Sequence, residues 1–161
     1  MADKDRTADR NETPAERLDR NWNDLLQEMR VMQTGVQLIA GFLLTLPFQQ
    51  VFEDLDDVQR TIYLVLVLVA GLTTAMMLVP IALHRRLFGD HVKDSLVRTA
   101  HLLVIVVLGA IGLLITGIVL LIFDVVVSRA AGLITGSVTL VLVVVLLAVL
   151  PALVERQALG D

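Results

Sequence analysis

Cysteine is absent from the 161-residue sequence. The chain therefore has no disulfide framework, no thiolate zinc site, no iron–sulfur cluster and no cysteine nucleophile. Charge is also scarce, because only 19% of the residues are charged, against about 25% in a typical soluble protein. This deficit of charge argues against a soluble domain.

Charged residues are missing altogether from four long stretches, residues 31–48, 61–83, 102–123 and 130–153. Hydrophobic residues make up 56% of the chain. Since a helix needs about 20 mainly apolar residues to cross the hydrocarbon core of a bilayer, each stretch predicts a membrane-spanning helix. The predicted fold is all-α, an integral membrane four-helix bundle over residues 31–153.

The parts outside these stretches are short. The longest is the N-terminal segment of 30 residues, whereas domains usually begin near about 50 residues. We therefore expect no catalytic domain outside the membrane, no catalytic residues and no enzymatic activity. Residues 2–16 alternate acids and bases without a large apolar side chain, which is typical of a disordered tail and predicts one over residues 1–16. Residues 154–161 form a second predicted tail.

Residues 17–30 have apolar side chains at helical spacing and polar side chains between them. This pattern predicts an amphipathic interfacial helix that lies on the membrane surface or on a partner and then bends into the first crossing. The single tryptophan suits the membrane interface. The apolar face comprises Leu18, Trp22, Leu25, Leu26 and Met29.

The connections between the spans carry most of the remaining signals. Asp56 or Asp57 is placed to cap the second crossing, where a carboxylate also meets the positive end of the helix dipole. The last connection is short enough to make spans three and four a tight hairpin. Asp124 and Arg129 then come within reach of each other, and pairing, or access to water, is favoured over a proton relay.

Lysine and arginine are distributed unevenly around the spans. Within about 15 residues of the crossings, eight lie in the N-terminal segment, the middle loop and the C-terminal tail, and two lie in the other loops. Because basic residues are retained in the cytoplasm, both termini are predicted to be cytoplasmic. The basic middle loop also holds His84, His91 and His101 without metal-ligand spacing, so we expect headgroup contacts there and no metal or other cofactor.

The first span differs from the others because one side of it is polar. The stripe consists of Arg30, Gln33, Thr34, Gln37 and Thr45. An amide that faces lipid loses its hydrogen bonds, so the stripe is expected to face other helices or water. Interhelical hydrogen bonding is the favoured interpretation, and the lining of a polar pathway is the alternative.

Small residues in the other spans mark candidate sites of close helix packing, within the hairpin or between copies of the protein. They are Gly71, Ala75, Gly109, Gly112, Gly132 and Gly136.

Three segments carry a resemblance to a known family: ERLDRNWNDLLQEMRVMQTGVQLIAGFLLTLPF (residues 16–48), LDDVQRTIYLVLVLVAG and PIALHRRLF. In these segments the chain resembles an uncharacterised family of small actinobacterial membrane proteins. The most distinctive part of the first segment is the string from Leu25 to Gln37. Members are sometimes named sodium:proton antiporters by automated naming. The resemblance implies the cytoplasmic membrane of a bacterium. However, antiport ordinarily needs a titratable group inside the membrane, and the four uncharged stretches contain none.

The sequence therefore predicts a multi-pass membrane protein that acts as an oligomerising or complex-associated interaction module. Its expected partners are the lipid bilayer and either further copies or another membrane protein, with no nucleic acid. The alternative is a small transporter or channel whose cation or proton pathway is lined by the polar face of the first helix.

Overall fold

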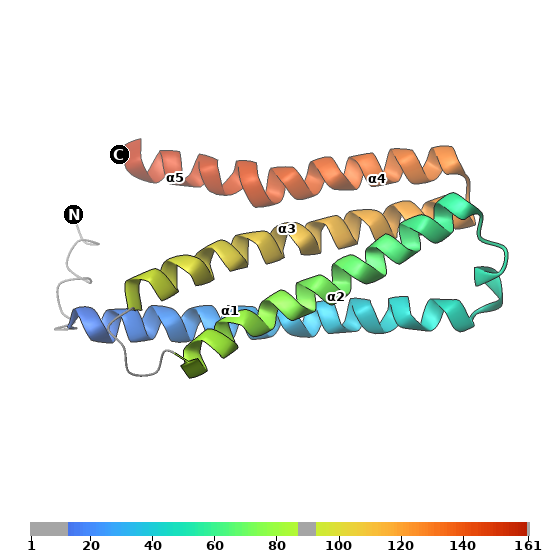
Figure 1. The fold of residues 1–161 in the computed structure, drawn as a ribbon. Coiled ribbons are helices and arrows are strands. Elements are labelled where there is room, and N and C mark those ends of the chain that lie inside the picture. Colours follow the sequence, from blue (N-terminus) through green and yellow to red (C-terminus); the bar gives the residue numbers. More distant parts are fainter. Residues whose placement is uncertain (1–12, 87–92, 161) are drawn as a thin grey trace.

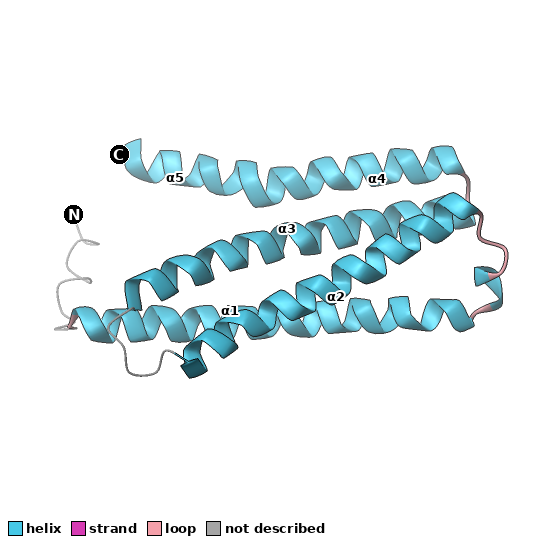
Figure 2. Cartoon of the chain, viewed as in Figure 1, coloured by secondary structure: helices cyan, strands magenta, loops and turns pink. Residues whose placement is uncertain are grey.

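The structure, a computed structural model, describes residues 13–86 and 93–160. Its helices are α1 (Pro14–Thr45), α2 (Asp57–Arg86), α3 (Lys93–Val126), α4 (Arg129–Val144) and α5 (Leu150–Gly160). Two short 3₁₀ turns, Leu46–Phe48 and Gln50–Phe52, lie between α1 and α2. The described ranges contain helices, turns and loops but no strand, which confirms the all-α prediction (Figure 2).

Four helical segments are long and apolar enough to cross a membrane, as predicted. They are Asn23–Phe48, Asp57–Ala82, Leu102–Val126 and Arg129–Gln157. Each reaches beyond the uncharged stretch that predicted it, since a helix does not end where charge begins. The first segment therefore includes Asp24, Glu28 and Arg30, and the third includes Asp124.

A capping box starts α1 earlier than the predicted boundary at residue 17. The Thr13 hydroxyl accepts a hydrogen bond from the Glu16 backbone N–H, and the Glu16 carboxylate accepts one from the Thr13 N–H. The Thr13 backbone N–H, and after it the Thr13 hydroxyl, which also donates to the Glu16 carboxylate, hold the pKa of Glu16 below its ordinary value. Pro14 occupies the first turn, where its missing N–H has no intrahelical partner to lose.

The helix α1 then runs without interruption to Thr45, whereas a separate interfacial helix with a bend was predicted. The reason is that residues 17–30 use the same apolar repeat as the residues after them. Leu25 and Met29 pack with the bundle core, and Leu26 is half-buried. The side chains of Leu18 and Trp22 lie outside the described part, so the interfacial position of residues 17–30 stays a prediction.

The core lies between α1, α2 and α3, and α4 packs on the far side of α3 (Figure 1). One cluster of buried side chains includes Leu43, Tyr63 and Leu114, and a second includes Met29 and Val107. The Pro14 end of α1 and the Gly160 end of α5 lie at the same end of the bundle (Figure 1). An even number of long helical segments that run back and forth produces this arrangement.

The fourth helix continues into α5 through a π-helical turn at Val145–Val149. Pro151 follows this turn, and it has no N–H to donate to the carbonyl of Leu147, against which its ring would also clash. A widened turn before a proline relieves this conflict. The α4–α5 segment therefore remains one helical unit that is long and apolar enough to span a membrane.

Candidate functional site

The first helix presents two different faces. Its inner face carries apolar side chains that alternate at intervals of four and three residues and pack on α2 and α3. They are Leu25, Met29, Met32, Val36, Ile39, Leu43 and Leu46. Such a repeat keeps one side of a helix against its neighbours over many turns.

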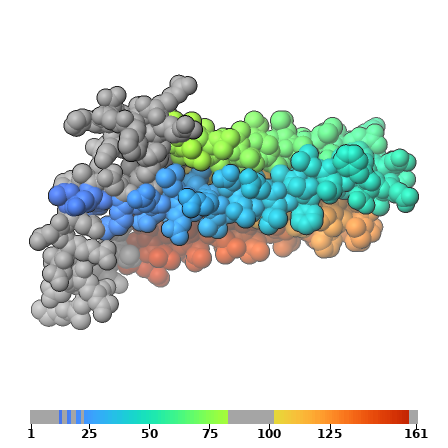
Figure 3. Space-filling model, turned by 90° about the horizontal axis from the view of Figure 1, so that it is seen from below, coloured from blue at the N-terminus to red at the C-terminus, as the bar shows by residue number. Residues whose placement is uncertain are grey.

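A second series with the same spacing runs along the outside of α1, and we name it the outer seam. Its members are Gln27, Arg30, Thr34, Gln37, Gly41 and Leu44, and Phe48 follows at the same sequence spacing in the 3₁₀ turn after α1; all of them are exposed. Figure 3 shows α1, in blue and cyan, lying along the open surface of the molecule. The outer-seam side chains are therefore accessible on the surface of one copy, and Gln27 among them also lines the crevice between α1 and α3.

The structure separates the polar residues predicted for the first span. Arg30, Thr34, Gln37 and Thr45 are exposed, and Gln33 is half-buried at the edge of the inner face. Within one copy, the stripe thus faces outward and not toward other helices.

The polar groups of the stripe differ in how they are satisfied. The Thr34 hydroxyl donates to the Arg30 carbonyl at 3.1 Å, and the Thr45 hydroxyl donates to the Phe42 carbonyl at 2.8 Å. Both hydroxyls therefore bond within α1. The side-chain amide of Gln37 forms no hydrogen bond with any residue in the described part of the chain. Gln37 lies close to the middle of the segment Asn23–Phe48, which is long and apolar enough to span a membrane.

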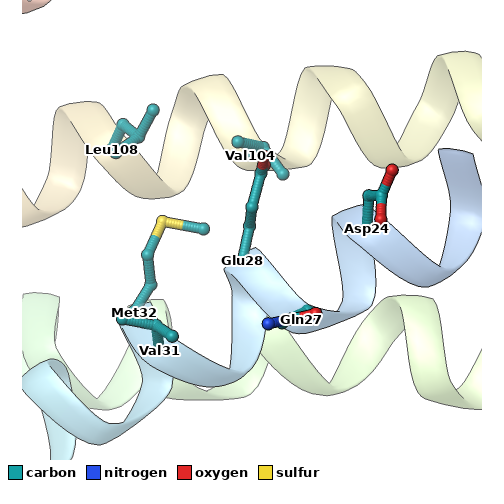
Figure 4. A pocket seen from close by; sticks show the side chains of 7 residues that line it. All are labelled: Asp24, Gln27, Glu28, Val31, Met32, Val104 and Leu108. Atoms are coloured by element: carbon teal, nitrogen blue, oxygen red, sulfur yellow. The ribbon is translucent and has the colours of Figure 1, made fainter.

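A crevice of about 630 Å³ lies between α1 and α3 near the start of both spans. Glu28 points from α1 toward Val104 of α3, and Met32 lies deeper along the same gap (Figure 4). The complete lining is Asp24, Gln27, Glu28, Val31, Met32, Val104 and Leu108. None of the five residues of the predicted polar stripe lines this crevice. The stripe and the crevice are therefore separate features.

At the opposite end of the bundle, Asp56 caps α2 as predicted. Its carboxylate accepts hydrogen bonds from the Val58 and Gln59 backbone N–H groups, both at 2.9 Å, and the Gln59 side chain accepts the Asp56 N–H. The Gln59 backbone N–H, with smaller contributions from the charge of Arg129 and from Val58, holds the pKa of Asp56 below its ordinary value.

Arg129 joins this cap to the α3–α4 hairpin. Its Nη2 atom donates to Asp56, and its Nε atom lies 3.1 Å from Oδ1 of Asp124, which confirms the predicted contact within the hairpin. The Asp124 side chain is only 2% exposed. The Asp124 contact is an ion pair without hydrogen-bond alignment, and among the described residues neither oxygen of Asp124 accepts a hydrogen bond. One guanidinium thus links two carboxylates from different helix pairs.

Tyr63 ties α1 to α2 near the same end. Its hydroxyl donates to the carbonyl of Leu43 at 3.0 Å. Pro47 lies four residues after Leu43 and lacks the N–H that would otherwise extend the helix from that carbonyl. Phe52 packs against the edge of the Tyr63 ring, with ring centroids 5.1 Å apart. The Leu43 carbonyl, which also accepts the Leu46 N–H, thus receives a second donor from α2 at the end of α1.

The small residues fall into two groups. Gly112, Gly132 and Gly136 lie at helix contacts, and a Cβ atom on Gly132 would come within 2.8 Å of the Leu120 carbonyl oxygen. Gly132 and Gly136 are the buried residues of α4, so α4 rests on α3 through two glycines. In contrast, Gly71, Ala75 and Gly109 are exposed, and apart from the neighbouring backbone of its own helix no described atom lies within 4 Å of the Cβ position of either glycine.

Sequence reasoning missed two features. The contact between Arg129 and Asp56 joins residues far apart in the chain, and no local pattern pointed to it. The crevice is lined by residues of α1 and α3 that lie far apart in the chain, which spacing does not reveal. The side chains of His84, His91 and His101 lie outside the described part. In the described ranges, no group of three His, Cys, Asp or Glu side chains could hold a metal ion.

The family model described as "Family of unknown function (DUF6328)" matches residues 11–151. The chain belongs to the DUF6328 family. The match covers all of α1 to α4, with the outer seam and the Asp56–Arg129–Asp124 cluster inside it. No curated protein and no solved structure matches the chain significantly. The family assignment agrees with the resemblance to an uncharacterised family and brings no activity with it.

Proposed function

We propose that this DUF6328 protein is a non-catalytic membrane interaction module, whose outer seam on α1 receives a helix of another membrane-protein chain. The observation that carries the proposal is the unbonded amide of Gln37, exposed near the middle of an apolar span.

The physical reason is the high cost of a polar group in hydrocarbon. Burial of an amide without a hydrogen-bond partner costs about 1–3 kcal/mol by protein mutational data. Because lipid tails cannot supply that bond, a helix docked on the outer seam is the group that can. The hydroxyls of Thr34 and Thr45 add no such demand, since both bond within α1.

The neighbouring side chains on α1 would complete an interface around the amide. Val31, Leu38 and Phe42 are exposed beside the seam, and Phe42 is 75% exposed. A central polar contact surrounded by apolar side chains is the pattern by which membrane helices gain specificity without losing packing. The proposed setting is the cytoplasmic membrane of a bacterium with both termini in the cytoplasm, supported by the uneven distribution of lysine and arginine.

Mass measurement tests the proposal. The protein would be extracted with its surrounding lipid into nanodiscs, without detergent, and its protein mass determined by native mass spectrometry. We expect assemblies well above the 17.6 kDa of one chain, and a shift toward single chains in Gln37→Leu. Gln33→Leu is the matched control, because it makes the same chemical change off the seam. A single chain without any partner would contradict the proposal.

A further inference from the structure

We infer that the outer seam binds a second copy of the same chain, in parallel, with the two Gln37 amides hydrogen-bonded to each other near the bilayer centre. This inference rests on the proposed function and names its partner. It depends on three properties of the seam: its self-complementary centre, its small residues and the place of its charge.

The centre of the seam is complementary to itself. Two chains inserted in the same direction are related by a twofold axis along the membrane normal, so each seam residue meets its own counterpart at the same depth. A carboxylate or a guanidinium at such a position would meet a like charge. The Gln37 amide instead carries both a donor and an acceptor and can bond to an identical group.

No other helix offers an equivalent reason for pairing. In the middle of the four spans, as far as the structure describes them, no other exposed side chain carries an amide or a charge. The outward side of α4, for example, presents apolar residues such as Val138 and Val141. Such a face is satisfied by lipid, whereas the α1 face is not.

The shape of the seam permits close approach at the same place. Thr34 and Gly41 flank Gln37 on the seam, and the space around the Cβ position of Gly41 is open to 4 Å. Small residues at a helix contact let the backbones come close enough for short side chains to bond across it. The alternating spacing of four and three residues favours a left-handed crossing of about 20°.

The charge on the seam lies away from this crossing point. Arg30 lies two turns from Gln37, toward the end where α1 begins. Helices that cross at an angle separate toward their ends, and a long arginine side chain reaches the headgroup region from there. At the other end the seam on α1 finishes with Leu44, which is 59% exposed and can pack on its counterpart, and Phe48 in the following 3₁₀ turn is 86% exposed.

The absence of cysteine makes a direct test possible without altering the rest of the chain. Thr34→Cys and Gly41→Cys place single thiols on the seam and keep Gln37. Leu68→Cys on α2 and Val138→Cys on α4 are the controls, because these two residues are 61% and 63% exposed within the spans. Each purified variant is reconstituted at a low protein-to-lipid ratio, oxidised with copper phenanthroline and scored for disulfide-linked dimer.

We expect at least about tenfold more dimer from the seam positions than from the controls, since two-fold symmetry brings only the seam thiols together. Adding Gln37→Leu to Gly41→Cys should weaken the dimer about threefold to tenfold, the range of one interhelical polar contact in a membrane. Adding Gln33→Leu should leave it unchanged. Equal cross-linking at Leu68→Cys, Val138→Cys and the seam would overturn the inference, because random collision would explain it.

A photo-reactive residue at position 34 in intact cells separates this inference from the proposed function. Cross-links to the same chain support both. Cross-links only to a different chain, with no self-linked dimer in the reconstituted system, overturn the second copy as partner and leave the interaction module standing. No cross-link to any chain in either setting overturns both.

Discussion

Removing the guanidinium of Arg129 should destabilise the bundle by leaving a buried carboxylate without its cation. Arg129→Met is the informative substitution, because it keeps most of the aliphatic stem and removes the charge. The Asp124 side chain, which is 2% exposed in the structure, would then have no positive group beside it. Asp56 would lose its link to the α3–α4 hairpin.

The size of the effect follows from the exposure of the two partners. Breaking a fully buried ion pair by removing one partner costs about 3–5 kcal/mol, and an exposed pair contributes about 0–1 kcal/mol. The Asp124 side chain is buried, but that of Arg129 is 44% exposed, so solvent screens part of the interaction. We therefore expect a loss of about 2 kcal/mol in the free energy of unfolding.

A double-mutant cycle measures this coupling by reversible unfolding in mixed micelles. Asp124→Asn removes the buried charge, so the double variant with Arg129→Met should recover at least about 1 kcal/mol relative to the sum of the single changes. A cycle of Arg129→Met with Asp57→Asn is the control, because Asp57 lies next to Asp56 without contacting Arg129 in the structure. Additivity within about 0.5 kcal/mol for Arg129 and Asp124 would refute the argument.

Three further predictions concern the same end of the bundle and can be measured in the same micelles. Gly132→Ala should lower the free energy of unfolding by about 1–3 kcal/mol, because it forces α4 away from α3. Gly71→Ala is made in open space and should be neutral or slightly stabilising. Equal effects of the two changes would show that α4 does not pack through glycine. Tyr63→Phe should cost about 1 kcal/mol by removing the donor to Leu43, and unchanged stability would mean that water replaces the hydroxyl. The folded-state pKa of Asp56 is lowered, so its carboxylate adds to the free energy of unfolding above the unfolded-state pKa of about 3.9, and this stabilisation is lost as pH falls through the folded-state pKa. Asp56→Asn keeps the cap and should flatten that part of the pH–stability curve.

Local signals predicted a large part of the fold. A charge-free stretch of sufficient length is a property of composition alone, so the four spanning helices followed from it. The Asp56 cap was predicted because capping needs only a carboxylate beside the first free N–H groups of a helix. The Asp124–Arg129 contact was predicted because a short connection leaves the chain little choice.

Other features depend on which faces of the helices meet. The boundary predicted between residues 17–30 and the first span is not visible in α1, because Leu25 and Met29 continue the repeat that packs in the core. Gly71 and Gly132 look equivalent in sequence, yet one faces open space and the other touches the α3 backbone.

The sequence by itself determined that this is a chain of four helices suited to a membrane, since hydropathy and capping act over neighbouring residues. Only the tertiary structure decided that the polar side of α1 points outward, away from the core. The reason is that α1 carries two repeats of the same spacing, and packing on α2 and α3 buries the apolar one. Gln37 is left at the surface by that choice, and with it the group on which the proposed pairing depends.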